Sequence, residues 1–317
     1  MASSQRCRRT PYYISSRVRP ATRRWQGDTK TSTTSARWFA SLLLFLQLCI
    51  STPAWAAKTR HVLVLNSYHP TYTWTRNIVD GAQSVLDKLP DVELSIEYMD
   101  TKKLYTPDYL AKLADVYAAK FANIHYDAVI STDDDALNFL LKYRDRLFPN
   151  VPVVFCGVNN FEDERIAGHA GITGVNEAND MRRNLEFIAS TYSKVKHLAV
   201  VHDQSATGQS VARQLRAIQP QYAGRFSFEY ITDVTRNELA LRVAQLPSDT
   251  LILWGVFMRD KAGDPLSPKQ SLGTVVGAAK VPVFSFWDFA IIEGAVGGYV
   301  VSGRHQGEAA AHMAERL

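Results

Sequence analysis

The sequence predicts an α/β protein built from two doubly wound lobes, each with a parallel β-sheet. The 317 residues are 46% hydrophobic and 21% charged, a composition typical of globular proteins. From residue 58 onward, short apolar runs alternate with stretches of 3.6-residue periodicity, which is the pattern of parallel strands joined by helical crossovers. This pattern occurs twice, and the roughly 260 residues available are enough for two lobes with separate cores.

Each predicted element has a local reason. The first strand, 61–66, is a continuous apolar run, as expected of a strand buried on both faces. The first helix, 77–88, has its apolar residues on one face, and Thr106 followed by Pro107 is a good helix start. The predicted strands are 61–66, 92–99, 128–131, 152–155, 197–201, 226–231, 250–253, 283–286 and 298–301. The predicted helices are 77–88, 107–122, 136–147, 181–191, 208–218, 237–245, 268–279 and 308–317.

The domain organisation follows from this order. About four strands fall before Gly174 and five after it, and residues 172–175 are interpreted as the linker between the halves. We expect an N-terminal lobe of residues 58–173 plus 304–317 and a C-terminal lobe of residues 176–300, with a cleft at the hinge.

The first 57 residues have the features of an export signal. A basic tract precedes a 13-residue apolar run, 38–50, and Ala54-Trp55-Ala56 follows as an A-x-A cleavage site. The run is shorter than the roughly 20 residues that span a bilayer. We therefore predict cleavage after Ala56 and a periplasmic protein, with an uncleaved anchor as the alternative.

The positive net charge of the chain does not indicate a nucleic-acid partner. Residues 1–57 hold nine basic residues and one acid, a net +8, so the chain's net +5 leaves −3 for residues 58–317. A mildly acidic body argues against binding a phosphate backbone. The export signal also takes the place of the DNA-binding helices that a repressor would need.

The loops that follow the strands hold the candidate binding residues, because ligands of parallel sheets bind at the carboxyl ends of strands. All three tryptophans beyond residue 57, Trp74, Trp254 and Trp287, lie in such loops. Aromatic walls with a few polar groups are typical of a small-molecule site, although large aromatic residues also close cores. The polar candidates are Asp133, Asp134 and Asp135, which could cap a helix or bind a ligand ammonium; Ser67 and Thr207, which suit a ligand carboxylate; and Arg259.

Enzymatic interpretations are weaker. The sequence has no G-x-G-x-x-G after the first strand, no P-loop and no G-x-S-x-G elbow, so we expect no cofactor. Its histidines lack metal-ligand spacing, so no metal is expected. Cys156 is the single cysteine beyond residue 57 and is interpreted as a buried apolar thiol.

Several segments together resemble a known family. They are 66–70 with Trp74, 98–102, 133–140, 148–159, 285–288 and 297–303. From about Arg60 to the C-terminus, the chain is similar to the ABC-transporter substrate-binding-protein-like family, which has the type I periplasmic binding protein fold. That family includes free solute-binding proteins, some of them for aromatic amino acids. Close relatives form the extracytoplasmic sensor domains of histidine kinases and diguanylate cyclases.

The resemblance implies a non-enzymatic protein that captures a small polar or aromatic molecule, such as an amino acid, by lobe closure. Its partner would be the membrane permease of an ABC importer. The alternatives are the sensor domain of a truncated kinase or cyclase, which would have a membrane output module as its partner, and an exported enzyme. From the N-terminal side, the implied ligand-binding residues are Ser67, Tyr68, Trp74, Asp133, Asp134, Gly157, Asn159 and Glu177. From the other lobe they are Asp203, Thr207, Trp254, Phe257, Trp287 and Asp288.

Overall fold

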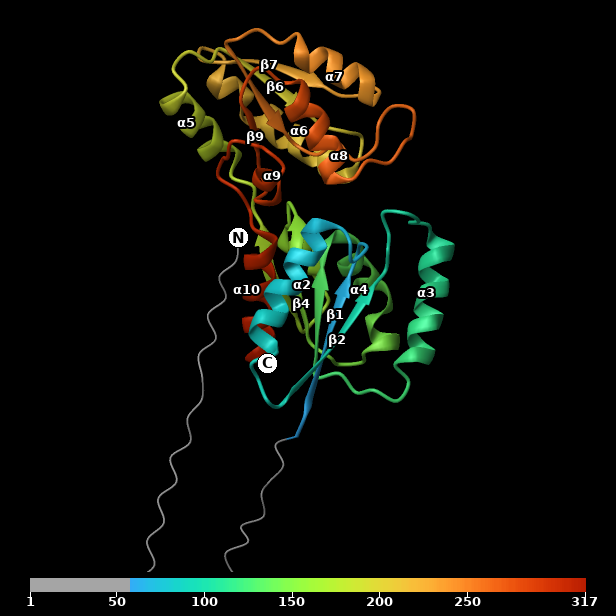
Figure 1. Cartoon of the computed structure of the whole chain (residues 1–317). Helices are drawn as coiled ribbons and strands as arrows, with labels where there is room; N and C mark the ends of the chain where they lie inside the picture. Colours follow the sequence, from blue (N-terminus) through green and yellow to red (C-terminus); the bar gives the residue numbers. More distant parts are fainter. Residues whose placement is uncertain (1–57) are drawn as a thin grey trace, which may run out of the picture. The chain divides into compact units, whose positions relative to one another are not determined.

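The structure, a computed structural model, describes residues 58–317 (Figure 1). The predicted signal peptide and its cleavage after Ala56 lie outside the described residues. Within this part of the chain, no helix has both the length and the apolar character needed to cross a membrane.

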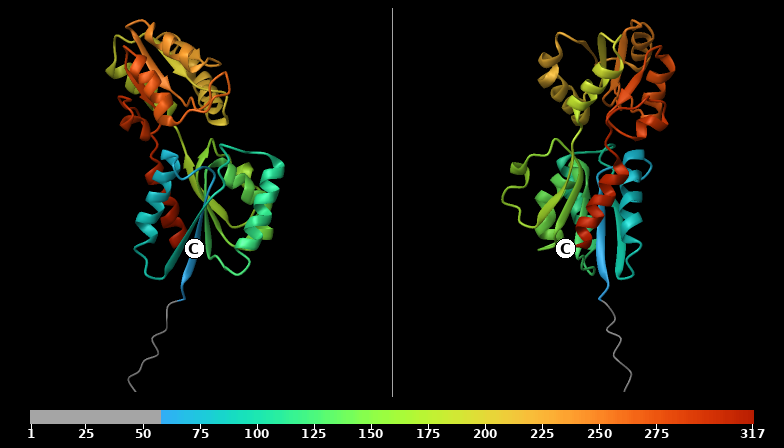
Figure 2. Two further views of the ribbon diagram at one scale, coloured as in Figure 1. Left: turned by 45° about the vertical axis from the view of Figure 1, so that its right-hand side comes forward. Right: turned by 90° about the vertical axis from the view of Figure 1, so that its left-hand side faces the viewer.

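The first half of the described chain forms a five-stranded parallel sheet of order β2-β1-β3-β4-β5. Helices α2 and α10 cover one face of this sheet, and α3 and α4 cover the other (Figures 1 and 2). The strands are β1 Arg60–Asn66, β2 Val92–Tyr98, β3 Ala128–Thr132, β4 Val153–Asn159 and β5 Ile172–Glu177. The helices are α2 Thr73–Leu86, α3 Pro107–Lys120, α4 Asp133–Leu147, the 3-10 turn η1 Asp163–Ile166, and α10 Gly303–Glu315.

The second half forms a four-stranded parallel sheet of order β7-β6-β8-β9. Its strands are β6 His197–Val201, β7 Ser227–Ile231, β8 Thr250–Trp254 and β9 Val283–Ser285. Its helices are α5 Met181–Thr191, α6 Ala206–Ile218, the 3-10 turn η2 Gln219–Tyr222, α7 Arg236–Ala244, α8 Pro268–Ala278 and α9 Phe289–Ile292. The predicted fold class, two parallel-sheet α/β lobes, is therefore confirmed.

The central strand β1 shows how the sequence builds the first core. Successive side chains of a strand point to opposite faces. Val62 and Val64 join the apolar cluster that contains α2 and α10, while Leu63 and Leu65 join the cluster that contains α3 and α4. Because both faces of β1 are covered, its sequence is a continuous apolar run. The strand ends at Asn66, at the edge of the sheet where the site forms.

Two details of the predicted order are wrong. Residues 172–175, interpreted as a linker, belong to β5, which pairs in parallel with β4 and ends at Glu177. Residues 298–301, predicted as a last strand, make one isolated bridge, that of Val301 with Trp287. Gly297 and Gly298 have φ angles of 151° and 138°, which disfavour a regular ladder. The halves thus hold five and four strands, not four and five.

The last helix, α10, begins at Gly303 rather than at the predicted residue 308, and Ser302 caps it. It lies directly against α2 (Figure 2). A Cβ atom at Gly81 of α2 would lie 2.1 Å from the backbone oxygen of Arg304, and one at Gly307 would lie 2.0 Å from that of Ile78. The two helices therefore approach closely because each has a glycine at the contact.

Candidate functional site

A pocket opens where the carboxyl ends of strands from both sheets come together. It holds about 370 Å³ of space free of atoms, including the part open to solvent. Its lining residues are Tyr68, Tyr72, Trp74, Lys102, Asp133, Asn159, Glu177, Thr207, Val256, Trp287 and Phe289. The pocket lies at the position that parallel α/β sheets favour for ligands.

Asp133 is the first residue of α4 and is 2% exposed. Its φ of +67° is uncommon for a residue other than glycine, and such strain is concentrated at functional sites. The indole Nε1 of Trp74 donates a 2.8 Å hydrogen bond to its Oδ1. Burial, and then the negative charge of Glu177, raise the pKa of Asp133 well above its usual value.

Glu177 ends β5 and is 5% exposed. The indole Nε1 of Trp287, which follows β9 in the second half of the chain, donates a 2.7 Å hydrogen bond to its Oε1. Burial is the main reason why the pKa of Glu177 rises to about 8, although this hydrogen bond lowers it. The pocket thus contains two buried carboxyl groups, each held by a tryptophan.

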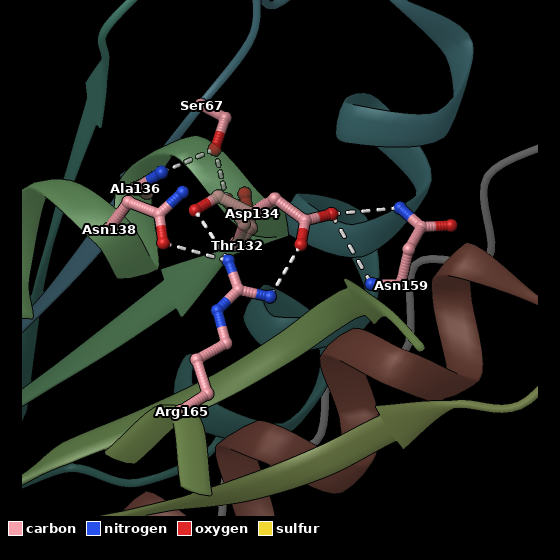
Figure 3. Close-up of polar contacts among 7 residues, drawn as sticks. All are labelled: Ser67, Thr132, Asp134, Ala136, Asn138, Asn159 and Arg165. Carbon is pink, nitrogen blue, oxygen red and sulfur yellow. Dashed lines mark hydrogen bonds and ion pairs between the residues drawn. The ribbon is translucent and has the colours of Figure 1, made fainter. Parts of the chain in front are cut away.

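Asp134 lies outside the lining and fixes a residue that is part of it (Figure 3). Its Oδ1 forms a 2.7 Å ion pair with Nη1 of Arg165. Its Oδ2 accepts hydrogen bonds from the backbone N of Asn159 at 3.3 Å and from the Nδ2 atom at 2.9 Å. Arg165 also donates to Oδ1 of Asn138 in α4 at 2.9 Å, so the Arg165 side chain is fixed to α4. The Asp134 carboxylate that it holds in place then orients Asn159.

Ser67 also has a supporting position rather than a place in the lining (Figure 3). Its Oγ donates to the backbone oxygen of Thr132 at 2.6 Å and accepts from the backbone N of Ala136 at 2.8 Å. The hydroxyl therefore satisfies a free N–H in the first turn of α4. Gly157, with φ of +68°, also lies outside the lining and packs against Asp133, because a Cβ at this glycine would be 3.0 Å from Oδ1 of Asp133.

In the second half, Asp203 shapes the loop after β8. Its Oδ2 accepts hydrogen bonds from the backbone N of Met258 at 2.6 Å and of Arg259 at 3.2 Å. Its own backbone N donates to the oxygen of Val256, which lines the pocket with a φ of +105°. A positive φ is a genuine outlier for a β-branched residue, so the surrounding hydrogen bonds hold this loop in a strained conformation.

The predicted residues therefore divide into two groups. Seven line the pocket: Tyr68, Trp74, Asp133, Asn159, Glu177, Thr207 and Trp287. The structure places seven others outside the lining: Ser67, Asp134, Gly157, Asp203, Trp254, Phe257 and Asp288. Of these, Trp254 is fully buried and donates to Ser271 at 3.2 Å. Phe257 lines a second cavity together with Asp203 and Arg259.

Sequence reasoning missed four lining residues: Tyr72, Lys102, Val256 and Phe289. Lys102 lies in the loop that follows the carboxyl end of β2, so the rule that ligands bind at strand ends could have found this residue. Val256 and Phe289 carry no polar group, and nothing local distinguishes them from core residues.

The residues considered for catalysis or for metal binding are placed as follows. Cys156 is fully buried, and burial raises the pKa of its thiol well above the ordinary value. Across residues 58–317, no three His, Cys, Asp or Glu side chains are grouped so that they could hold a metal ion.

Solved structures with the same fold include several ligand-binding proteins. An ABC domain from Streptococcus pneumonia in complex with L-Trp has a TM-score of 0.56 at 16% identity, covering 82% of this chain and 84% of that one. A ligand-free, open substrate binding protein with adhesive properties from Clostridium difficile has a TM-score of 0.56 at 14% identity, covering 81% and 84%. A carbohydrate transporter from Acidothermus cellulolyticus in complex with myo-inositol has a TM-score of 0.51 at 17% identity, covering 81% and 86%.

At these identities the similarity establishes the fold, which is that of type I periplasmic binding proteins. A search of curated proteins finds no match. The family model for ABC transporter substrate binding proteins matches residues 117–317, which is more than half of the chain. The chain therefore belongs to the ABC transporter substrate binding protein family.

Proposed function

We propose that this chain is the solute-binding protein of an ABC importer, and that it captures one small molecule in the pocket lined by Asp133 and Glu177. Family membership supports the transport role. The observation that carries the proposal is the pocket itself, because strand ends of both sheets supply its aromatic and carboxyl groups. Such a constellation suits the recognition of a small molecule.

Closure of the two lobes supplies the mechanism. Tyr68 and Asp133 reach the pocket from the first half of the chain, and Thr207 and Trp287 reach it from the second. A solute that contacts both halves binds the closed form more tightly and shifts the population toward it by that difference in affinity. The membrane permease then recognises the closed form in the periplasm, where the predicted signal peptide would deliver the protein.

The proposed role is binding without turnover. A serine, threonine or cysteine nucleophile needs a base in contact with its hydroxyl or thiol. Of the groups that the structure describes, Thr207 is the aliphatic hydroxyl in the lining, and no hydrogen bond within 3.5 Å joins its side chain to a base. The Cys156 thiol is buried outside the lining.

The test is a solute screen on the purified protein that records tryptophan fluorescence and thermal unfolding. We expect one class of compound to change the fluorescence of Trp74 and Trp287 saturably, to raise the unfolding midpoint as its concentration exceeds Kd, and to be recovered unchanged by mass spectrometry. The change Asp133→Asn should weaken this binding, and the matched change Asp108→Asn, in the exposed first turn of α3, should not. Conversion of the compound, or the absence of binding across all solute classes, would overturn the proposal.

A further inference from the structure

The lining of the pocket holds more acidic than basic side chains. Two buried carboxyl groups, Asp133 and Glu177, face a single cationic side chain in the lining, Lys102. The ammonium of Lys102 lies 4.2 Å from the ring centroid of Tyr68, and its side chain is exposed. Neither carboxyl group forms an ion pair with a described residue within 4.0 Å, so the negative charge that the two would carry when ionised has no close counterpart in this part of the chain.

Each carboxyl group also has one oxygen that does not accept an indole hydrogen bond. Oδ1 of Asp133 and Oε1 of Glu177 accept the two indole hydrogen bonds. Oδ2 of Asp133 has only the Thr132 hydroxyl 3.4 Å away, and that hydroxyl lies closer, at 3.0 Å, to Oδ1 of Asn66. The side chain of Asn179 approaches the Glu177 carboxyl and lowers its pKa, and none of the described hydrogen bonds within 3.5 Å goes to Oε2. A carboxylate oxygen can accept more than one hydrogen bond, so a donor from a solute would add to the bonding of both groups.

The neighbouring helix end disfavours an anion. A free helix N-terminus attracts negative charge because its N–H groups are unpaired. Here the first turn of α4 carries three acidic residues, 133–135, and Ser67 already accepts the hydrogen bond of Ala136. Asp134 is already paired with Arg165, so the carboxyl groups of Asp133 and Asp135 are the ones that oppose a solute carboxylate at the place where the fold would otherwise bind one.

Aromatic rings complete the surroundings. Tyr68, Tyr72, Trp74, Trp287 and Phe289 line the same pocket. Trp287 stacks on Phe289 with ring centroids 6.3 Å apart, and Trp74 meets Phe289 edge to face at 6.5 Å. The faces of such rings attract organic cations, and they do so most strongly in a desolvated site.

We infer that the solute is a net cationic organic amine, whose ammonium group binds between the carboxylates of Asp133 and Glu177 against the aromatic rings. This inference rests on the proposed function, since it names the chemical class that the same pocket takes up. It adds a consequence at neutral pH. A bound ammonium favours the ionised form of Glu177, whose pKa of about 8 keeps the carboxyl largely protonated in the empty site, so binding releases a proton.

The test compares four probes that share a phenyl ring and a short carbon chain: phenethylamine, phenylalanine, 2-phenylethanol and 3-phenylpropionate. Binding is measured by tryptophan fluorescence and by calorimetry in two buffers that differ in ionisation enthalpy. We expect phenethylamine to bind about tenfold or more tightly than the zwitterion and the neutral alcohol, and the anion to bind weakest. The measured binding enthalpy should depend on the buffer, which shows proton release.

Two pairs of variants locate the effect. We expect Asp133→Asn and Glu177→Gln each to weaken phenethylamine binding about tenfold or more. The matched changes Asp108→Asn and Glu93→Gln, at exposed acidic residues of α3 and β2, should leave it unchanged. Unfolding midpoints show that the variants are folded.

The outcomes separate this inference from the proposed function. Tighter binding of the anion, the zwitterion or the alcohol overturns the cationic class and leaves solute capture standing. Phenethylamine binding that ignores both carboxylate variants also overturns it. If none of the four probes binds, the inference fails, and the wider solute screen then decides whether the proposed function fails as well.

Discussion

Replacing Glu177 with glutamine should change how the stability of the ligand-free protein depends on pH. Glutamine has nearly the same shape as glutamate, and its carbonyl can still accept the hydrogen bond of Trp287. The change therefore removes the ionisable group and leaves the packing in place.

The sign of the effect follows from proton binding. In the unfolded chain, the carboxyl of Glu177 ionises near its ordinary pKa of 4.5, whereas in the folded protein it keeps its proton up to a pKa of about 8. Between these values the folded state binds more protons, so raising the pH favours unfolding. One group changes the free energy of unfolding by up to about 1.4 kcal/mol per pH unit, so the whole window is worth roughly 5 kcal/mol.

The assay is urea unfolding of the wild type and of Glu177→Gln from pH 4 to pH 9, without added solute. The titratable groups away from Glu177 are the same in both proteins, so their contribution cancels in the difference between the two free energies of unfolding. We expect that difference to grow steadily in favour of the variant between about pH 5 and pH 8. The control Glu93→Gln, at an exposed strand residue, should follow the wild type. Parallel curves for wild type and Glu177→Gln would refute the assignment of a buried, protonated carboxyl.

Three further changes test the packing and the hydrogen bonds around the site. Gly81→Ala places a Cβ 2.1 Å from a backbone oxygen of α10 and should lower the free energy of unfolding by about 1–3 kcal/mol. The control Gly273→Ala, whose Cβ would have no atom within 4 Å, should raise the free energy of unfolding by about 0.5–1 kcal/mol. Equal urea midpoints for the two variants would contradict the close helix contact. Trp287→Phe removes the hydrogen bond that lowers the pKa of Glu177, so the loss of stability with rising pH should continue to a higher pH than in the wild type; an upper limit that stays in place would show that the bond is not made. Arg165→Met breaks a partly exposed ion pair with α4 and should lower the free energy of unfolding by no more than about 1 kcal/mol, measured in a thermal melt. Binding of the solute found in the screen should weaken. An unchanged affinity would mean that this ion pair does not orient the lining.

The site combines strain with charge burial, and both have costs. Asp133 and Val256 have positive φ angles, and Asp133 and Glu177 are carboxyl groups taken out of water. Such features persist where the surrounding structure holds them and where binding a ligand offsets their cost. A solute that completes both carboxylates would therefore stabilise the protein more strongly than its size suggests.

The sequence by itself determined the two parallel-sheet halves and the rim on which the pocket forms. Continuous apolar runs such as β1 indicate strands covered on both faces, and helices between such strands require parallel pairing. Because strand ends carry the ligand in these folds, the lining residues Trp74, Asp133, Thr207 and Trp287 could be found from position, whereas Tyr68, Asn159 and Glu177 were implied by the family resemblance.

Only the tertiary structure decided which strand-end residues share the pocket and which support it. Trp254 and Trp287 look alike in sequence, but one lies in the core against Ser271 and the other reaches Glu177, 110 positions earlier in the chain. Residues 172–175 have the look of a linker, but pairing with β4 makes them an edge strand that carries Glu177 to the site. Contacts between residues this far apart depend on how whole elements pack, and local periodicity carries no information about that packing.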